Sequence, residues 1–177
     1  GWSIYPGGAA AWARCVMGSP LSEENPHYMR LESGQPGAGL RNKAYDGIYL
    51  KKGMDYKLVF WARCVKFAGD FVIFAEKDGV RQAEGKIPAA EGKEETYNHF
   101  RKYETVLRAG ETVEKADFVL GLSEEGIVEL DFVSLMPQDA VAGIFRRDLF
   151  EMLKNLRPGF LRFPGGCIVE GNTLANR

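Results

Sequence analysis

The stretch Tyr56–Val65, which reads YKLVFWARCV, decides the fold class of this 177-residue chain. Its apolar residues recur at every second position, which is the period of a β-strand with one face in a core. Lys57 and Arg63 occupy the opposite face, where Val59 and Trp61 interrupt the polar pattern. The residues predicted to share the core face are Tyr56, Leu58, Phe60, Ala62 and Cys64.

A hairpin and another strand are predicted after this stretch. Lys77-Asp78-Gly79 is a turn signal that joins Phe71–Glu76 to Val80–Glu84. The segment Glu84–Asn98 is polar and contains a proline, so we expect an exposed loop there. His99–Leu107 is the next candidate strand.

Two further strands complete this part of the chain. Ala116–Leu122 alternates, and Glu124-Glu125-Gly126 is the predicted turn into Ile127–Met136. That last strand places Val128, Leu130 and Phe132 on one face. Short strands with turns between them, and no helix among them, predict a β-sandwich or jelly roll over residues 1–137.

The composition excludes several classes of protein. The net charge is −1, whereas a nucleic-acid partner normally requires a basic face. No apolar run approaches the roughly 18 residues of a membrane span, so we expect neither a nucleic-acid nor a membrane partner. Cys15 and Cys64 could form a disulfide in an oxidising compartment, but unpaired, buried thiols are the preferred interpretation. There is no C-x-x-C pair, which argues against structural zinc.

The pattern changes after Pro137. Apolar residues recur at helical spacing over 144–156, and Arg157-Pro158-Gly159 is expected to stop that helix. A short apolar strand at 160–163 and a glycine loop follow, which is typical of an α/β unit. One helix and one strand cannot bury themselves, so both chain ends are interpreted as cuts within a longer protein.

Arg162 is the most unusual residue of this second part. An arginine within an apolar strand is costly to bury without a partner. It therefore either braces a catalytic carboxylate or forms a structural ion pair, and the residues alone leave both interpretations open.

The segment Gly159–Gly171, GFLRFPGGCIVEG, resembles the second-strand motif of glycoside hydrolase family 51, the α-L-arabinofuranosidases. Phe145–Gly166, Leu130–Pro137 and the motif Asn25-Pro26-His27-Tyr28-Met29-Arg30-Leu31 are similar to the same family, as is Tyr45-Asp46-Gly47-Ile48. The resemblance thus extends over nearly the whole chain. It implies a galactose-binding-like jelly roll inserted after the first strand of a catalytic (β/α)₈ barrel, followed by one α/β unit of that incomplete barrel over residues 138–177.

The resemblance also implies roles for individual residues. Arg162, Gly165, Gly166 and Cys167 would line the arabinose-binding subsite, where Cys167 stands in place of the asparagine of other branches. A retaining glycosidase needs two carboxylates about 5–5.5 Å apart, and in this family both are glutamates on later barrel strands. No catalytic residue is therefore assigned within this chain, and Glu170 is interpreted as a loop residue.

The sandwich itself has candidate ligand residues. Sugar-binding modules stack sugar rings on exposed aromatic side chains, and we single out Tyr28, Tyr45 and Trp61 for this role, although most aromatic residues in alternating strands belong to the core. Similar jelly rolls hold a structural calcium ion, to which Asp131 is the candidate ligand; an Asp131 that only accepts hydrogen bonds is the alternative. No other cofactor is expected.

Three hypotheses for function follow. In the first, the chain is an inactive fragment of a retaining α-L-arabinofuranosidase that acts on arabinan or arabinoxylan. In the second, it is a non-catalytic module that binds such a polysaccharide; in the third, the sandwich is a structural insert that binds nothing. A secreted or periplasmic location is favoured over the cytoplasm, and a homo-oligomeric parent is left open.

Overall fold

The structure, a computed structural model, describes residues 1–160. The chain falls into two units, Gly1–Gln138 and the residues from Asp139 onward. The strands of the first unit are β1 (Trp2–Tyr5), β2 (Ala11–Val16), β3 (Tyr28–Ser33), β4 (Gly39–Asn42), β5 (Ile48–Leu50), β6 (Asp55–Lys66), β7 (Asp70–Lys77), β8 (Val80–Pro88), β9 (Arg101–Arg108), β10 (Val113–Leu122) and β11 (Gly126–Pro137).

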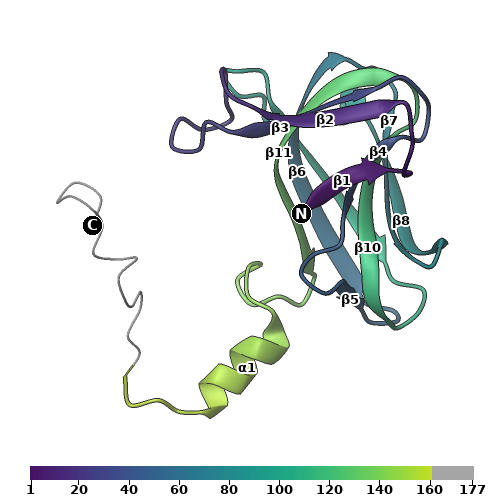
Figure 1. The fold of residues 1–177 in the computed structure, drawn as a ribbon. Coiled ribbons are helices and arrows are strands. Elements are labelled where there is room, and N and C mark those ends of the chain that lie inside the picture. Colours follow the sequence, from purple (N-terminus) through teal and green to yellow (C-terminus); the bar gives the residue numbers. More distant parts are fainter. Residues whose placement is uncertain (161–177) are drawn as a thin grey trace. The chain divides into compact units, whose positions relative to one another are not determined.

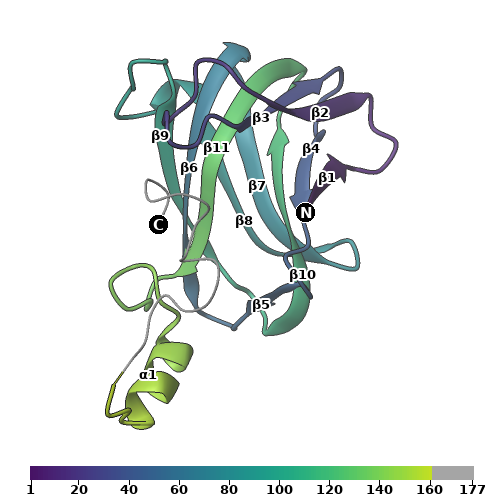
Figure 2. The same ribbon diagram turned by 60° about the vertical axis from the view of Figure 1, so that its left-hand side comes forward.

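These strands form two antiparallel sheets that lie face to face (Figures 1 and 2). One sheet has the order β1-β4-β10-β7-β8, with β5 also paired to β10. The other has the order β2-β3-β11-β6-β9. Several successive strands, such as β1 and β2 or β10 and β11, lie in different sheets, so their connections cross between the layers, as in jelly rolls. The predicted mostly-β sandwich is confirmed.

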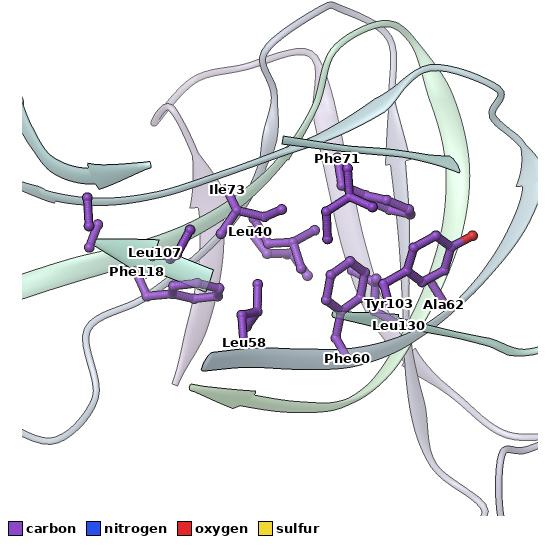
Figure 3. Packing of buried hydrophobic residues seen from close by; sticks show 14 of the residues in the cluster. Leu40, Leu58, Phe60, Ala62, Phe71, Ile73, Tyr103, Leu107, Phe118 and Leu130 are labelled. Carbon is purple, nitrogen blue, oxygen red and sulfur yellow. The ribbon is translucent and has the colours of Figure 1, made fainter. Parts of the chain in front are cut away.

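The core lies between the sheets, and β6 contributes to it as predicted. Tyr56, Leu58, Phe60 and Ala62 are buried, and Cys64 is half-buried on the same face. Figure 3 shows Phe60 and Tyr103 with Phe71 nearby; Phe60 stacks on Tyr103 with 5.1 Å between ring centroids. An alternating strand must bury its apolar face, and the second sheet covers that face here.

The predicted hairpin is also confirmed. β7 and β8 pair in antiparallel register, with Lys77 opposite Val80. Asp78 and Gly79 form the two-residue connection, with φ angles of 51° and 79°. Two successive positive φ angles are the signature of a type I′ turn, which aspartate followed by glycine favours.

The prediction that Phe132 faces the core with Val128 and Leu130 is wrong. Val128 and Leu130 are buried, but Phe132 is 64% exposed. The register of β11 against β6 shifts between Asp131 and Ser134, and Phe132 has a left-handed φ of 47°. An extra residue in a strand breaks the two-residue alternation, so the side chain turns outward. The left-handed conformation costs a non-glycine residue about 1–2 kcal/mol.

The predicted loop Glu84–Asn98 is also partly wrong. β8 continues to Pro88, and a 3₁₀ turn (η1) follows at Ala89–Glu91. Ile87 and Ala89 are buried despite their polar neighbours. β8 lies at the edge of its sheet, where a proline at the strand end removes no necessary hydrogen bond.

Cys15 and Cys64 are free thiols, and the prediction that both are buried is wrong for Cys15, which is exposed. Strands β3 and β11 lie between β2 and β6. Three strand spacings separate the two cysteines by about 14 Å, well beyond the separation that a disulfide can bridge.

In a Cys167→Ser background, Cys15 should react with Ellman's reagent at least several-fold faster than Cys64. Burial raises the pKa of the Cys64 thiol and so lowers its thiolate fraction. The reaction, followed by absorbance at neutral pH, should therefore have a fast and a slow phase. Loss of the fast phase in the Cys15→Ser variant would assign that phase to Cys15. A fast phase that instead disappears with Cys64→Ser would contradict the observed exposures.

The second unit contains one described helix, α1 (Arg147–Asn155), which lies within the expected range 144–156. It ends before Arg157, whose φ of 45° and following proline prevent continuation. None of the helix residues is buried, and the exposed apolar side chains are Leu149, Phe150, Met152 and Leu153. The rest of the predicted strand 160–163 and the glycine loop lie outside the described residues. No helix among residues 1–160 has the length and apolar character to cross a membrane.

Candidate carbohydrate-binding surfaces

The three aromatic residues singled out for sugar stacking lie in different environments. Tyr28, at the start of β3, is only 8% exposed, and its ring lies edge-on to Phe100 and beneath the Arg63 guanidinium. Trp61, in β6, is half-buried and lies opposite Asp131 and Lys102 on the neighbouring strands. Tyr45, in the loop between β4 and β5, is fully exposed. Of the three, Tyr45 therefore offers the most accessible ring.

The loop that carries Tyr45 is held by short-range contacts. Asn42 Oδ1 accepts a hydrogen bond from the Ala44 amide at 2.7 Å, and Ala44 has a φ of 51°. Gly47 closes the loop with a φ of 86° and lies against the backbone of Lys115 in β10. A Cβ at Gly47 would lie 2.0 Å from Lys115 Cα, so only glycine fits. The loop is thus positioned by the sheet beneath it.

A polar pocket of about 330 Å³ lies beside this loop, and we name it the Tyr45 cleft. It opens among the β4–β5 loop, the β7–β8 turn and β10. Its lining residues are Lys43, Tyr45, Asp46, Gly47, Glu76, Lys77, Asp78, Lys115 and Asp117. An exposed aromatic ring beside carboxylates and ammonium groups provides both a stacking surface and hydrogen-bonding groups for hydroxyls.

Ion pairs neutralise most of the charges in the Tyr45 cleft. Lys115 pairs with Asp46 at 3.0 Å, and Lys43 approaches Asp117 at 3.7 Å. Glu76 and Asp117 lie directly opposite each other on β7 and β10. Tyr5 donates its hydroxyl to Glu76 Oε2 at 3.0 Å, and burial together with that carboxylate raises the pKa of Tyr5. Asp117 thus lies near a lysine and Glu76 accepts a phenolic hydrogen bond, and the oxygens of both carboxylates can accept further hydrogen bonds.

A second pocket, of about 250 Å³, opens where β3 stops pairing with β11, and we name it the edge pocket. Three core leucines and three aromatic side chains contribute to its lining. The lining residues are Trp2, Cys15, His27, Tyr28, Met29, Leu40, Leu120, Leu130, Asp131, Phe132 and Val133. The structure therefore places Tyr28 and Asp131 together, but keeps both apart from Tyr45.

Asp131 does not belong to a cluster of metal ligands. Its Oδ1 accepts a hydrogen bond from the Phe132 amide at 2.7 Å, and burial raises its pKa. Within residues 1–160, no three His, Cys, Asp or Glu side chains come together as a potential metal site. Asp131 thus offers a calcium ion a single carboxylate, and the calcium prediction rests on that residue alone.

Sequence reasoning missed a buried charge network on the outer face of the five-stranded sheet. Glu129 of β11 accepts hydrogen bonds from Arg30 of β3 at 2.9 Å and from Arg63 of β6 at 2.6 Å. Arg63 also donates to the carbonyl groups of Ser19 and Asn98. The sequence signal was the presence of charged residues within strands, but pairing required knowledge of the strand order. The network ties the loop before β3 to the sheet.

The residues predicted for the arabinose subsite, namely Arg162, Gly165, Gly166 and Cys167, lie outside the described residues. The same holds for Glu170. Their roles remain predictions from the sequence.

Comparison with protein-family profiles found no match. Among curated proteins, the chain is 36% identical over 142 residues to α-L-arabinofuranosidase 2 of Arabidopsis thaliana, a match that covers 79% of this chain and 21% of that protein. It is 30% identical over 158 residues to an extracellular exo-α-L-arabinofuranosidase of Streptomyces chartreusis, a match that covers 87% of this chain and 18% of that protein. The chain thus spans about a fifth of the length of the curated relatives it matches.

Solved structures share the sandwich fold at low sequence identity. A structure of the CBM22-1 and GH10 modules of Clostridium thermocellum xylanase 10B with xylohexaose matches with a TM-score of 0.53 and 14% identity, covering 80% of this chain and 27% of that one. A cyclase from Fischerella matches with a TM-score of 0.54 and 15% identity, and the match covers 78% of this chain and 85% of the cyclase chain. These likenesses concern the fold alone. Over most of its length, the chain is therefore homologous to a segment of α-L-arabinofuranosidases, as the sequence motifs indicated, and its sandwich has the fold of carbohydrate-binding modules.

Proposed function

We propose that the chain is a segment of a retaining α-L-arabinofuranosidase and that its sandwich is a non-catalytic domain of that enzyme. The observation that carries the proposal is the homology to α-L-arabinofuranosidases over about four-fifths of the chain. The whole enzyme would remove terminal α-L-arabinofuranosyl groups from arabinan or arabinoxylan through a glycosyl-enzyme intermediate, with both carboxylates supplied from outside this chain. The extracellular relative favours a secreted parent.

The purified chain should not release 4-nitrophenol from 4-nitrophenyl α-L-arabinofuranoside. The physical reason is that a retaining mechanism needs two carboxylates about 5–5.5 Å apart at the sugar, and we assign neither to this chain. A longer protein that adds the remaining barrel should hydrolyse the same substrate, and NMR should show an initial product with retained anomeric configuration. Turnover by the chain alone, above a buffer blank, would contradict the proposal.

We also propose that the Tyr45 cleft binds the polysaccharide. Its support is the combination of a fully exposed ring with carboxylates and ammonium groups around a single pocket. A sugar face would stack on the Tyr45 ring while its hydroxyls exchange hydrogen bonds with Glu76, Asp117 and Lys43. The carbohydrate-binding modules with the same fold support such a role for the sandwich.

Tyr45→Ala should weaken binding of arabino- or xylo-oligosaccharides by about fivefold to tenfold, since an aromatic contact contributes on the order of 1 kcal/mol beyond its area. Isothermal titration calorimetry measures the loss. Tyr97→Ala is the matched control, because Tyr97 is equally exposed but does not line the cleft. If the unaltered chain binds no oligosaccharide at all, the sandwich is the structural insert of the third hypothesis.

A further inference from the structure

The edge pocket differs chemically from the Tyr45 cleft. Its floor is formed by Leu40, Leu120 and Leu130, which come from both sheets and are otherwise part of the core. The Trp2 ring lies edge-on to the Phe118 ring, with 6.2 Å between the ring centroids. Trp2 remains partly exposed to solvent. A polyol placed on this floor would lose hydrogen bonds to water without replacement. The pocket therefore favours a ligand with an apolar body.

The wall formed by Phe132 shows an unusual local conformation. Its φ of 47° is strained for an aromatic residue, and Phe132 is 64% exposed although Leu130, two positions earlier, is buried. The bulge that imposes this conformation lies at the pocket. Bulges next to binding sites re-aim side chains, and local strain persists where surrounding structure enforces it. The strained backbone and the exposed aromatic side chain of Phe132 are explained together if its ring packs against a bound ligand.

Asp131 is the one carboxylate among the described residues that line this largely apolar pocket. One of its oxygens accepts the Phe132 amide hydrogen bond, and no lysine, arginine or histidine of the described chain forms an ion pair with it. Because the Asp131 carboxylate is partly buried and has no cation of residues 1–160 beside it, a further hydrogen-bond donor would stabilise it. The second oxygen is suited to a hydroxyl group on a ligand that enters the pocket.

We propose that the edge pocket binds a small aromatic ring that carries a hydroxyl group. The ring lies on the three leucines between Trp2 and Phe132, and the phenolic O–H donates to Asp131. The size agrees, because a cavity of about 150 Å³ lined by apolar side chains accommodates benzene, and the edge pocket measures about 250 Å³. This site is independent of the proposed sugar binding at the Tyr45 cleft.

Titration of the ¹⁵N-labelled chain with 4-methylphenol, toluene and L-arabinose tests the ligand class. We expect 4-methylphenol to shift the amide signals of residues 130–133, toluene to bind about tenfold more weakly, and L-arabinose to shift none of them. Asp131→Asn should weaken 4-methylphenol about tenfold and leave toluene unchanged, since the asparagine carbonyl still accepts the Phe132 amide. Stronger perturbation of these residues by L-arabinose, or equal affinity for 4-methylphenol and toluene, would overturn the proposal.

Phe132→Gly separates a binding role from a structural one. Glycine adopts the left-handed conformation without strain, so the variant should unfold at a higher urea concentration and yet bind 4-methylphenol at least fivefold more weakly. Tyr97→Ala, which removes an exposed ring that lines neither pocket, should change neither quantity. Unaltered 4-methylphenol affinity in Phe132→Gly would show that the ring serves no ligand, whatever happens to stability.

Discussion

Replacement of Glu129 with alanine should lower the free energy of unfolding by about 3–5 kcal/mol, the loss typical when one partner of a buried ion pair is removed. The Glu129 side chain is only 6% exposed and lies between Arg30 and Arg63 in the centre of the five-stranded sheet. Its removal leaves two guanidinium groups close together without their shared carboxylate. Arg63 also holds the loop before β3, so that loop should loosen as well.

Urea unfolding followed by tryptophan fluorescence measures this loss. Glu104→Ala is the matched control: Glu104 also lies between two cations, Lys57 and Lys102, but its side chain is 33% exposed. A solvent-exposed ion pair contributes about 0.2–1 kcal/mol. If both variants lose the same stability, the network around Glu129 does not stabilise the sheet as its burial indicates.

Phe60→Ala should cost about 3–5 kcal/mol, the range found for buried phenylalanines. Phe60 has no exposed surface, stacks on Tyr103 and meets Phe71 edge-on, both with 5.1 Å between ring centroids. Truncation removes these contacts and leaves a cavity that strands of two rigid sheets cannot close. The loss should appear as a lower midpoint of urea unfolding.

Two controls separate this cavity effect from a general effect of substitution. Phe60→Leu retains most of the volume and should cost distinctly less than Phe60→Ala. Val106→Ala, on the outer face of the neighbouring strand β9, removes a half-exposed side chain and should change stability by about 0.5 kcal/mol or less. Equal losses in Phe60→Ala and Val106→Ala would mean that the aromatic cluster is not the centre of the core.

Much of the fold could be predicted because the strands are strongly patterned. In β6 the alternation from Tyr56 to Ala62 matches the burial residue by residue, since a strand with one covered face has only one stable register. The β7–β8 turn could be predicted because Asp78-Gly79 favours positive φ angles that few other pairs adopt. Phe132 could not be placed, because a bulge depends on the partner strand and leaves no distinct mark in the sequence.

The candidate sites were less accessible to sequence reasoning. Tyr28 and Tyr45 are chemically identical, yet Tyr28 is buried beneath Arg63 and Tyr45 is fully exposed. This difference depends on which loop lies over which sheet, which is a long-range property. Asp131 could be singled out from the sequence, but its neighbours Trp2 and His27 lie more than a hundred residues away along the chain.

The sequence by itself determined the β-sandwich, the position of its strongest hairpin and the kinship with α-L-arabinofuranosidases, because alternation, turn chemistry and motifs are local properties. Only the tertiary structure decided that Glu129 joins two arginines, that Phe132 turns outward, and that a polar cleft and an apolar pocket lie apart from each other. These features depend on strand order, on register and on the packing of one sheet against the other. The residues that form such contacts lie far apart along the chain, so the sequence does not show that they are close in space.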